Sequence, residues 1–294
     1  MSAISTLDFD FVAALAYRQA AIVLERGKEY LVEARLTPLA HREGFTSLAK
    51  LVEALRRDLV EGVLHAKAVD ALTTNETYFF RDFHPFEALR RLLLPELIAL
   101  LQDSRRLTIW CAACSTGQEP YSLAMLIREH FPQLADWKIE IIATDLSPTV
   151  LRQAEAGRYN QIEINRGLPA PYLVKYFTQQ DAAWFLKPAI RSMVQFRPLN
   201  LIQPWPILPA CDLIFIRNVM IYFDVATKKT ILKKLRNCLR PEGSLLLGSS
   251  ETTINLDPHW APVTQGTTVV YRPAVAVLAA KAVGPAPAPQ KSPE

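Results

Sequence analysis

Residues 107–130, LTIWCAACSTGQEPYSLAMLIREH, join an apolar run to an amphipathic segment through a turn of small residues. The spacing predicts a β-strand from Leu107 to Ala113 and a helix from Tyr121 to His130. Gly117 permits a positive φ or the close approach of a ligand, and Pro120 suits a first helical turn. This strand, turn and helix are typical of an α/β sheet that binds a nucleotide, although the GxGxxG fingerprint of dinucleotide sites is absent.

The same alternation continues toward the C-terminus and predicts a parallel sheet with crossover helices. Residues 157–191 are too many for an ordinary loop, so we expect an inserted subdomain there. The other predicted strands are Ile139–Leu146, Val194–Leu199, Asp212–Ile216, Ser244–Gly248 and a closing Thr267–Tyr271, and the other predicted helices are Thr149–Ala156 and Ala226–Leu239.

The N-terminal part of the chain has the helical period instead, which predicts a small helical domain over residues 1–72. Residues 73–105 then form a linker and a helix, and the α/β domain is expected over residues 106–272. Residues 273–294 are rich in Ala and Pro, a composition that favours a disordered tail. The apolar positions that best show the helical period are Leu48, Leu51, Val52, Leu55 and Leu59.

Composition limits the class of protein. A chain of 294 residues with 50% apolar and 21% charged residues can bury a sizeable core. Its net charge of +4 is interspersed with acids and does not imply nucleic acid. The longest apolar stretch, Leu92 to Leu101, contains Pro95 and Glu96 and is too short to span a bilayer. Because the N-terminus also lacks a basic n-region, we expect a cytoplasmic protein without membrane insertion.

Four cysteines, Cys111, Cys114, Cys211 and Cys238, are too irregularly placed for a disulfide framework, which agrees with a reducing compartment. Cys111 and Cys114 form a CxxC, which leaves two interpretations open: metal or redox use, or small residues packed at a strand end. A structural zinc site needs a second ligand pair, and the five histidines form no HExxH. No metal is therefore expected.

Asp145 ends the predicted strand in the sequence IIATDLS. This position puts a carboxylate at the carboxyl edge of the strand beside the first turn, within reach of a ribose diol bound there. The alternative is that Asp145 caps the following helix, although Ser147 is closer for that role.

Five motifs in register resemble the CheR family of chemotaxis receptor glutamate methyltransferases, over about residues 10 to 272. The resemblance implies a Rossmann-like α/β domain that binds S-adenosylmethionine, an N-terminal all-helical domain and a small inserted β-subdomain. The motifs are TTNETYFFRD at 73–82, WCAACSTGQEPYSLAM at 110–125, ATD at 143–145, PLNL at 198–201 and FIRNVMIYFD at 215–224.

Carried over by position, the resemblance implies a cofactor pocket lined by Asn75, Thr77, Arg81, Glu119, Asp145, Asn200, Leu201, Arg217 and Asn218. In this pocket Asp145 is expected to accept hydrogen bonds from the ribose. Glu119 is expected to bind the amino group of the methionine moiety, and Arg81 is expected to bind the carboxylate of that moiety. Asn200 and Leu201 bracket the adenine, although for Leu201 and Thr77 plain packing is the alternative. The chain departs from the family's commonest pattern at Gln118, where Glu is usual, and at Cys111.

The expected reaction gives a glutamate methyl ester and S-adenosylhomocysteine. A glutamate carboxylate is ionised at neutral pH, so its attack on the sulfonium methyl needs no general base. Arg217 and Tyr222 are the candidates to orient that carboxylate. Two other classes stay open: a methyltransferase acting on nucleic acid or a small molecule, and a non-catalytic module that binds the cofactor or a receptor.

The expected partner is the cytoplasmic domain of a chemotaxis receptor. Lys50, Arg56 and Arg57 are predicted to dock on its acidic helices, unless they form an ordinary solvated face. Residues 184–186 and 193–196 are predicted to form a hairpin around a turn at 187–190. The outer edge of this hairpin would bind a receptor's C-terminal peptide by strand addition, or the hairpin would only cover the sheet edge.

Overall fold

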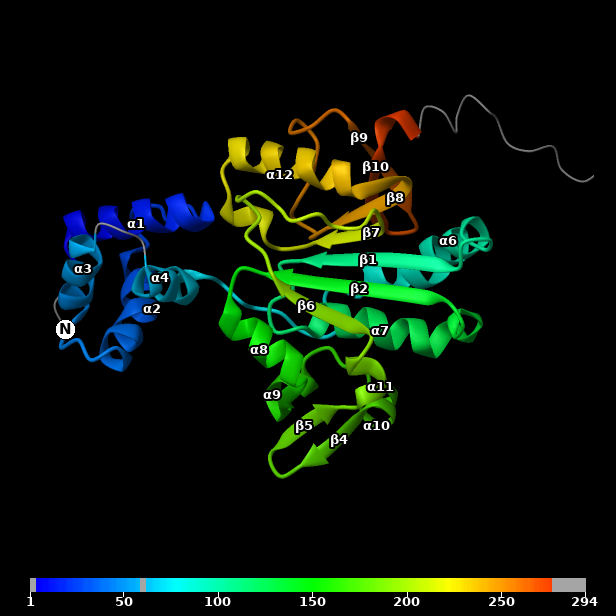
Figure 1. Cartoon of the computed structure of the whole chain (residues 1–294), viewed down its shortest axis with the longest axis horizontal. Coiled ribbons are helices and arrows are strands. Elements are labelled where there is room, and N and C mark those ends of the chain that lie inside the picture. Colours follow the sequence, from blue (N-terminus) through cyan, green and yellow to red (C-terminus); the bar gives the residue numbers. More distant parts are fainter. Residues whose placement is uncertain (1–3, 59–61, 277–294) are drawn as a thin grey trace, which may run out of the picture.

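The computed structural model describes residues 4–58 and 62–276. Figure 1 shows a helical domain beside a larger α/β domain, with a small β-subdomain below the large sheet. The helical domain consists of α1 (Thr6–Ala20), α2 (Glu29–Arg42), α3 (Leu48–Arg57) and α4 (Val63–Leu72). Ser5 and Ser47 cap α1 and α3, and Leu51, Val52 and Leu55 are buried in the domain core. Leu59, which belongs to the same predicted period, lies outside the described residues.

The large sheet has seven strands in the order β6-β2-β1-β7-β8-β10-β9. The five strands from β6 to β8 are parallel, and β10 and β9 are antiparallel additions. The strands are β1 (Arg106–Ala112), β2 (Lys138–Asp145), β6 (Val194–Pro198), β7 (Cys211–Ile216), β8 (Leu239–Leu247), β9 (Trp260–Gln265) and β10 (Thr268–Pro273). This topology confirms the predicted Rossmann-like α/β class.

Helices cover both faces of the large sheet (Figure 1). One face packs against α7 (Gln118–His130) and α8 (Pro148–Ala156), and the other packs against α12 (Val225–Cys238). β1 and β7 lie between these layers and are buried almost throughout, as continuous apolar strands are when both sheet faces are covered. The remaining helical elements of this domain are α5 (His84–Ala88), η1 (Leu89–Leu93), α6 (Leu94–Leu100), η2 (Pro132–Leu134) and η3 (Met220–Tyr222).

The inserted subdomain is a three-stranded antiparallel sheet in the order β3-β5-β4. It packs on the large domain through aromatic rings, because buried Phe79 makes edge contacts with Tyr159 and Phe177. Its elements are β3 (Arg158–Asn160), α9 (Gln161–Asn165), α10 (Ala170–Tyr176), β4 (Phe177–Gln180), β5 (Ala183–Leu186) and α11 (Pro188–Arg191).

The predicted hairpin of residues 184–186 and 193–196 is wrong. β5 does belong to the subdomain, but β6 pairs in parallel with β2 in the large sheet. Three of the four residues of the expected turn at 187–190 lie in α11 instead. The hairpin of the subdomain joins β4 to β5 instead. Two apolar runs close in sequence can thus belong to different sheets, and the pattern of either run alone does not show its partner.

The C-terminal end also differs from expectation. β9 was not predicted, and Pro273 of the expected tail pairs with Trp260 at the end of β10. The amide of Ala274 donates to the carbonyl of His259, so the chain is still held at this point. The rest of the predicted tail, from residue 277, lies outside the described residues. Across the described part of the chain, no helix has the length and apolar character needed to cross a membrane.

Candidate functional site

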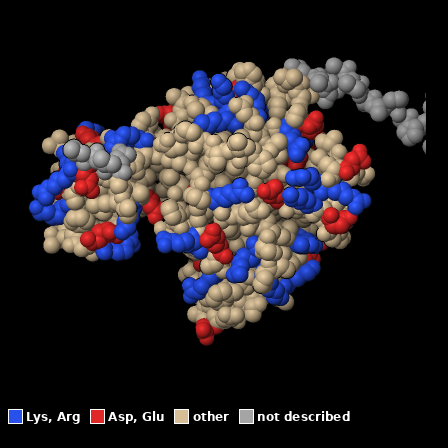
Figure 2. Space-filling model, in the orientation of Figure 1, with Lys and Arg blue, Asp and Glu red and all other residues tan. Residues whose placement is uncertain are grey.

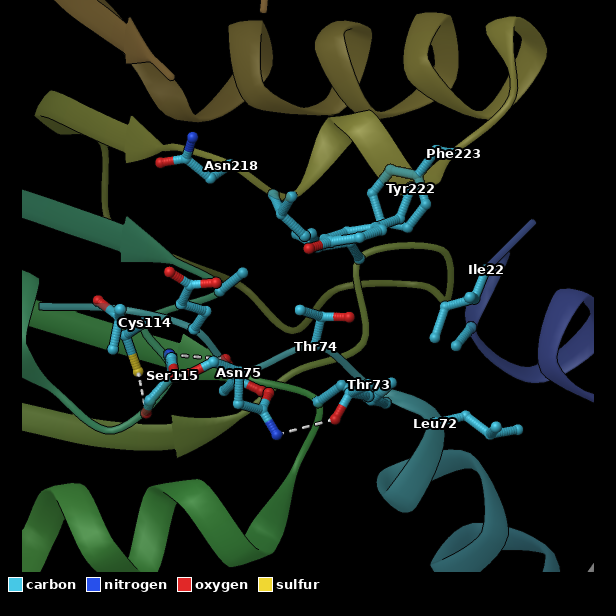
Figure 3. A pocket seen from close by; sticks show the side chains of 18 of the residues that line it. Ile22, Leu72, Thr73, Thr74, Asn75, Cys114, Ser115, Asn218, Tyr222 and Phe223 are labelled. Carbon is cyan, nitrogen blue, oxygen red and sulfur yellow. Dashed lines mark hydrogen bonds between the residues drawn. The ribbon is translucent and has the colours of Figure 1, made fainter. Parts of the chain in front are cut away.

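A cavity of about 220 Å³ opens beyond the carboxyl ends of β1, β2 and β7, between the large sheet and the helical domain (Figure 3). Strand ends beside the first β-strand of a doubly wound sheet are where such folds bind ligands. Every residue that the sequence predicted for the site lines this cavity, namely Asn75, Thr77, Arg81, Glu119, Asp145, Asn200, Leu201, Arg217, Asn218 and Tyr222.

The turn between β1 and α7 forms the floor of the cavity with an unusual backbone. Ala113 and Ser115 have φ of 60° and 50°, and Gly117 has φ of 91°. A Cβ on Gly117 would lie 2.9 Å from the Cβ of Ala154 in α8, so this position needs glycine for its conformation and for its space. The hydroxyl of Ser115 donates to the carbonyl of Asn75 at 2.8 Å, which joins the turn to the linker segment.

The side chain of Asp145 forms hydrogen bonds to two turns, the one between β1 and α7 and the one that leads into α8. Its Oδ2 accepts from the amide of Ser115 at 2.8 Å and its Oδ1 accepts from the amide of Ser147 at 2.9 Å. Burial raises the pKa of Asp145 above its ordinary value, against the lowering effect of these backbone donors. Ser147 itself caps α8 by accepting from Val150. Each carboxylate oxygen can accept a further hydrogen bond, so Asp145 retains capacity for a ribose hydroxyl.

A buried charge cluster lies on the opposite side of the turn. Arg217, whose side chain is 1% exposed, donates from Nη1 to Glu119 and from Nη2 to Asp82, each at 2.8 Å. Nη2 also donates to the carbonyl of Arg81. Burial raises the pKa of Glu119, although the adjacent Arg217 opposes that shift. Two carboxylates share one guanidinium, so with both ionised the cluster has a net negative charge that suits a cationic ligand group.

This cluster restrains Arg217, one of the two residues expected to orient a glutamate carboxylate. Nη1 and Nη2 are engaged by Glu119, Asp82 and the carbonyl of Arg81, and only Nε has no partner within the described part of the chain. Tyr222 lines the cavity, and within the described part of the chain its hydroxyl forms no hydrogen bond. Its backbone carbonyl accepts from the amide of Val23. Of the two side chains, Arg217 is thus the one held in place by ion pairs, and both line the cavity.

The side chain of Asn200, expected beside adenine, lines the cavity and also bonds within the protein. Its side-chain nitrogen donates to the carbonyl of Gln19 at the end of α1 at 2.7 Å, and its side-chain oxygen accepts from the amide of Ile202. Asn200 thus connects the two domains at the edge of the cavity.

The helical domain supplies lining residues that sequence reasoning missed. They come from the end of α1, from the connection between α1 and α2 and from α2 itself, and no motif in the sequence pointed to them. Arg35 donates to the carbonyl of Leu72 and to the hydroxyl of Thr74, which closes the cavity on this side. The residues are Ala20, Ile22, Val23, Leu24, Lys28, Leu31 and Arg35.

The two departures from the family pattern lie outside the cavity lining. Gln118 is buried and accepts from the hydroxyl of Thr116 at 2.7 Å, so it acts within the turn rather than on a ligand. Cys111 and Cys114 are buried free thiols, and burial raises the pKa of each well above its ordinary value. Such thiols are unreactive. Within residues 4–58 and 62–276, no group of three His, Cys, Asp or Glu could hold a metal ion.

Comparisons with known proteins agree with this division of the chain. Residues 7–73 match the family model described as "CheR methyltransferase, all-alpha domain", and residues 75–270 match "CheR methyltransferase, SAM binding domain". Similar curated proteins include Chemotaxis protein methyltransferase 1 of Pseudomonas aeruginosa, 43% identical over 90% of this chain and 97% of that protein. Another is Chemotaxis protein methyltransferase Cher2 of Pseudomonas putida, 40% identical over 90% of this chain and 98% of that protein.

These matches span nearly all of the described chain, and they coincide with the two domains whose contact forms the cavity. The chain therefore belongs to the CheR methyltransferase family and is an S-adenosylmethionine-dependent methyltransferase.

Proposed function

We propose that this protein transfers a methyl group from S-adenosylmethionine to glutamate side chains on the cytoplasmic domain of a chemotaxis receptor. The observation that carries the proposal is the cavity, where the carboxylate of Asp145 and a negatively charged cluster lie in one site. The curated relatives are described as chemotaxis protein methyltransferases, which supports a receptor as the substrate. Because the acceptor lies in the cytoplasm, the enzyme acts there.

The residues of the cavity fit the cofactor. Asp145 takes the ribose hydroxyls, and Glu119 takes the amino cation of the methionine moiety. Arg81, which is partly exposed and donates one bond to the carbonyl of Glu76, has further donors for the cofactor's carboxylate. Two buried polar atoms, Nε of Arg217 and Oδ1 of Asn218, have no hydrogen-bond partner within the described part of the chain. Buried polar groups are normally paired, so we expect ligand atoms or water at these positions.

When bound, the cofactor supplies an electrophilic sulfonium methyl. The protein's part in the reaction is positional. Tyr222 holds the glutamate carboxylate by a hydroxyl hydrogen bond, and the closure of the helical domain over the cavity excludes water. The negative cluster of Arg217, Glu119 and Asp82 favours a cationic donor before transfer. The acceptor glutamate is already ionised at neutral pH, so no residue needs to take a proton.

The test is a transfer assay with methyl-labelled S-adenosylmethionine and receptor-rich membranes. We expect label on the receptor that alkali releases as methanol, because carboxyl methyl esters hydrolyse under these conditions. Receptors whose acceptor glutamates are replaced by alanine serve as the control. Calorimetric binding of S-adenosylhomocysteine without transfer would instead indicate a non-catalytic module. Label on nucleic acid or a small molecule, but not on the receptor, would assign a different substrate.

A second part of the proposal concerns a receptor's C-terminal peptide, which we place on the free edge of β4. The amide of Lys187 donates to the carbonyl of Tyr176, and pairing alternates along an antiparallel ladder. The backbone groups of Gln179 therefore point away from β5. The other edge is partly occupied, since the amide of Asn160 in β3 donates to the carboxylate of Glu163. An extended peptide that adds to β4 would meet unpaired donors and acceptors.

The basic residues of α3 remain a weaker docking proposal. Figure 2 shows Lys and Arg on the helical domain interspersed with acidic side chains. Lys50 and Arg57 both pair with Glu53, and Arg56 pairs with Asp8. These exposed ion pairs leave a smaller net positive field than the sequence suggested, although a partner's carboxylates can compete for them.

A further inference from the structure

Glu251 accepts hydrogen bonds from the loop that carries the proposed transfer residues. Its Oε2 accepts from the amide of Asn218 at 2.8 Å. Its Oε1 accepts from the amides of Val219 and Met220 at 3.0 and 2.8 Å. A fourth amide, that of Gly248, donates to Oε2 at 2.7 Å. One carboxylate therefore joins the segment after β8 to three successive residues after β7.

The loop needs such an anchor because of its conformation. Asn218 has φ of 59°, a region that few residues other than glycine adopt, although Asn tolerates it best. Met220 begins the short helix η3, whose first amides have no partner within the helix. The carboxylate of Glu251 accepts from the first of these amides, that of Met220, and from the amides of the two residues before it. Charged acceptors form stronger hydrogen bonds than neutral ones. Tyr222, the proposed contact for the acceptor, ends this same helix.

Gly248 shows that the space around the carboxylate is limited. A Cβ at this position would lie 2.7 Å from Oε2 of Glu251 and 2.8 Å from both the backbone and side-chain nitrogens of Asn218. The glycine thus allows the ends of β7 and β8 to approach closely enough for the carboxylate to bridge them. Glu251 itself is outside the lining of the cavity, so it would act through the loop and not by touching a ligand.

We infer that Glu251 is a positioning residue for methyl transfer: its carboxylate fixes the backbone of residues 218–220 and thereby places Tyr222 beside the methyl acceptor. The inference rests on the proposed function, because it takes Tyr222 as the contact for the glutamate. It adds a residue that none of the sequence motifs contained.

The decisive variant is Glu251→Gln, which keeps the size of the side chain. Each carboxylate oxygen accepts two amides, so the amide group of Gln would oppose two N–H donors whichever way it is turned. We expect the turnover number to fall at least about tenfold, which corresponds to about 1.4 kcal/mol. The KM for receptor and the melting temperature should stay close to those of the wild type. Glu251→Asp keeps the charge but has a shorter side chain. Its turnover number should lie between those of the wild type and Glu251→Gln.

Hydrogen exchange of the peptide that contains residues 217–222 tests the anchoring without any substrate. Exchange should be at least about tenfold faster in Glu251→Gln than in the wild type, while that of β7 is unchanged. Glu242→Gln, an exposed substitution in β8, is the matched control and should change neither exchange nor turnover.

Wild-type turnover or wild-type exchange in Glu251→Gln would overturn the inference. A loss of turnover matched by an equal loss in Glu242→Gln or by a large fall in melting temperature would also overturn it, because either result would mean general damage. If the wild type itself transfers no methyl group to the receptor, the proposed function fails. The exchange measurement then still decides whether Glu251 anchors the loop.

Discussion

Asp145 supports the backbone of two turns as well as lining the cavity, and this affects how its role can be tested. Alanine would leave the amides of Ser115 and Ser147 without acceptors, whereas asparagine retains one oxygen. We expect Asp145→Asn to weaken binding of S-adenosylhomocysteine about 10- to 100-fold, because a hydrogen bond to a charged group is worth about 1.5–3 kcal/mol. Calorimetry measures the affinity.

Asp136→Asn is the control for this substitution. Asp136 is 62% exposed and pairs with Arg105, at the amino end of β1 and β2 and therefore away from the cavity. Asp136→Asn should leave the affinity for S-adenosylhomocysteine unchanged. If Asp145→Asn also binds with wild-type affinity while remaining folded, the ribose assignment is wrong.

The raised pKa of Glu119 gives a second prediction at the scale of a residue. Burial makes its protonated form more favourable in the folded, cofactor-free protein than in the unfolded chain. Its contribution to stability is therefore present below about pH 4 and is lost as pH rises through the folded-state pKa. A cationic amino group prefers the ionised form. Cofactor affinity should consequently fall as pH decreases through that raised pKa, and binding in this range should release a proton.

Calorimetry at about pH 5 to 8, in buffers of different ionisation enthalpy, measures both effects. Glu119→Gln should bind the cofactor more weakly, and its affinity should depend less on pH. We assign the pH dependence that remains to Asp145, because burial also raises the pKa of Asp145. An unchanged pH profile in Glu119→Gln would remove Glu119 from the cofactor site.

The turn between β1 and α7 is the element that most directly couples fold and site. At Gly117, alanine would meet both backbone strain and Ala154 in α8, whereas Gly44 has a similar φ of 83° with open space around it. Strain of this kind costs about 1–3 kcal/mol. We expect Gly117→Ala to reduce the free energy of unfolding by more than Gly44→Ala, and the difference isolates the contact with Ala154. Urea denaturation of both variants measures this difference. Equal losses of unfolding free energy would show that α8 can shift to make room for the added methyl group without destabilising the protein.

The elements that sequence reasoning found are those with a strong local signal. β7 is a continuous apolar run with a polar Arg217 directly after it, so its strand and its site residue were both predictable. β9, with Pro262 and alternating exposure, has no such signal, and it is held by pairing with β10. Register with a distant strand depends on tertiary packing. This also explains why Val194–Leu199 was correctly predicted as a strand of the large sheet while the predicted pairing of residues 193–196 with 184–186 was wrong.

At the scale of the whole molecule, the site is shared between domains that lie far apart in sequence. The motif residues come from the α/β domain and the linker, and the helical domain closes the cavity through contacts such as Val23 with Tyr222 and Gln19 with Asn200. The hydroxyl of Tyr17 in α1 also donates to Asp224, the N-cap of α12, at 2.6 Å. None of these long-range contacts follows from local spacing, so the motif residues were predictable and their enclosure was not.

The subdomain gives the last prediction, because its edge offers a second point of attachment for a receptor. Deleting residues 157–191 would be a poor test: Tyr159 donates to the carbonyl of Thr116 in the β1–α7 turn and packs on Phe79, so the site itself would be damaged. Gln179→Pro is cleaner, since it removes one outward N–H from the edge of β4 and leaves the ladder with β5 intact. Gln179→Ala keeps that N–H and serves as the control.

We expect a fluorescent peptide with the sequence of a receptor C-terminus from the same organism to bind the wild type and Gln179→Ala equally. It should bind Gln179→Pro at least about tenfold more weakly, because strand addition depends on main-chain hydrogen bonds. Methylation of a receptor that lacks this C-terminus should be the same in all three proteins, since tethering raises the local concentration of substrate without changing the chemical step. Equal peptide binding by the two variants would exclude the β4 edge. If no peptide binds up to about 1 mM while the intact receptor is methylated at a normal rate, the enzyme reaches its substrate through other surfaces.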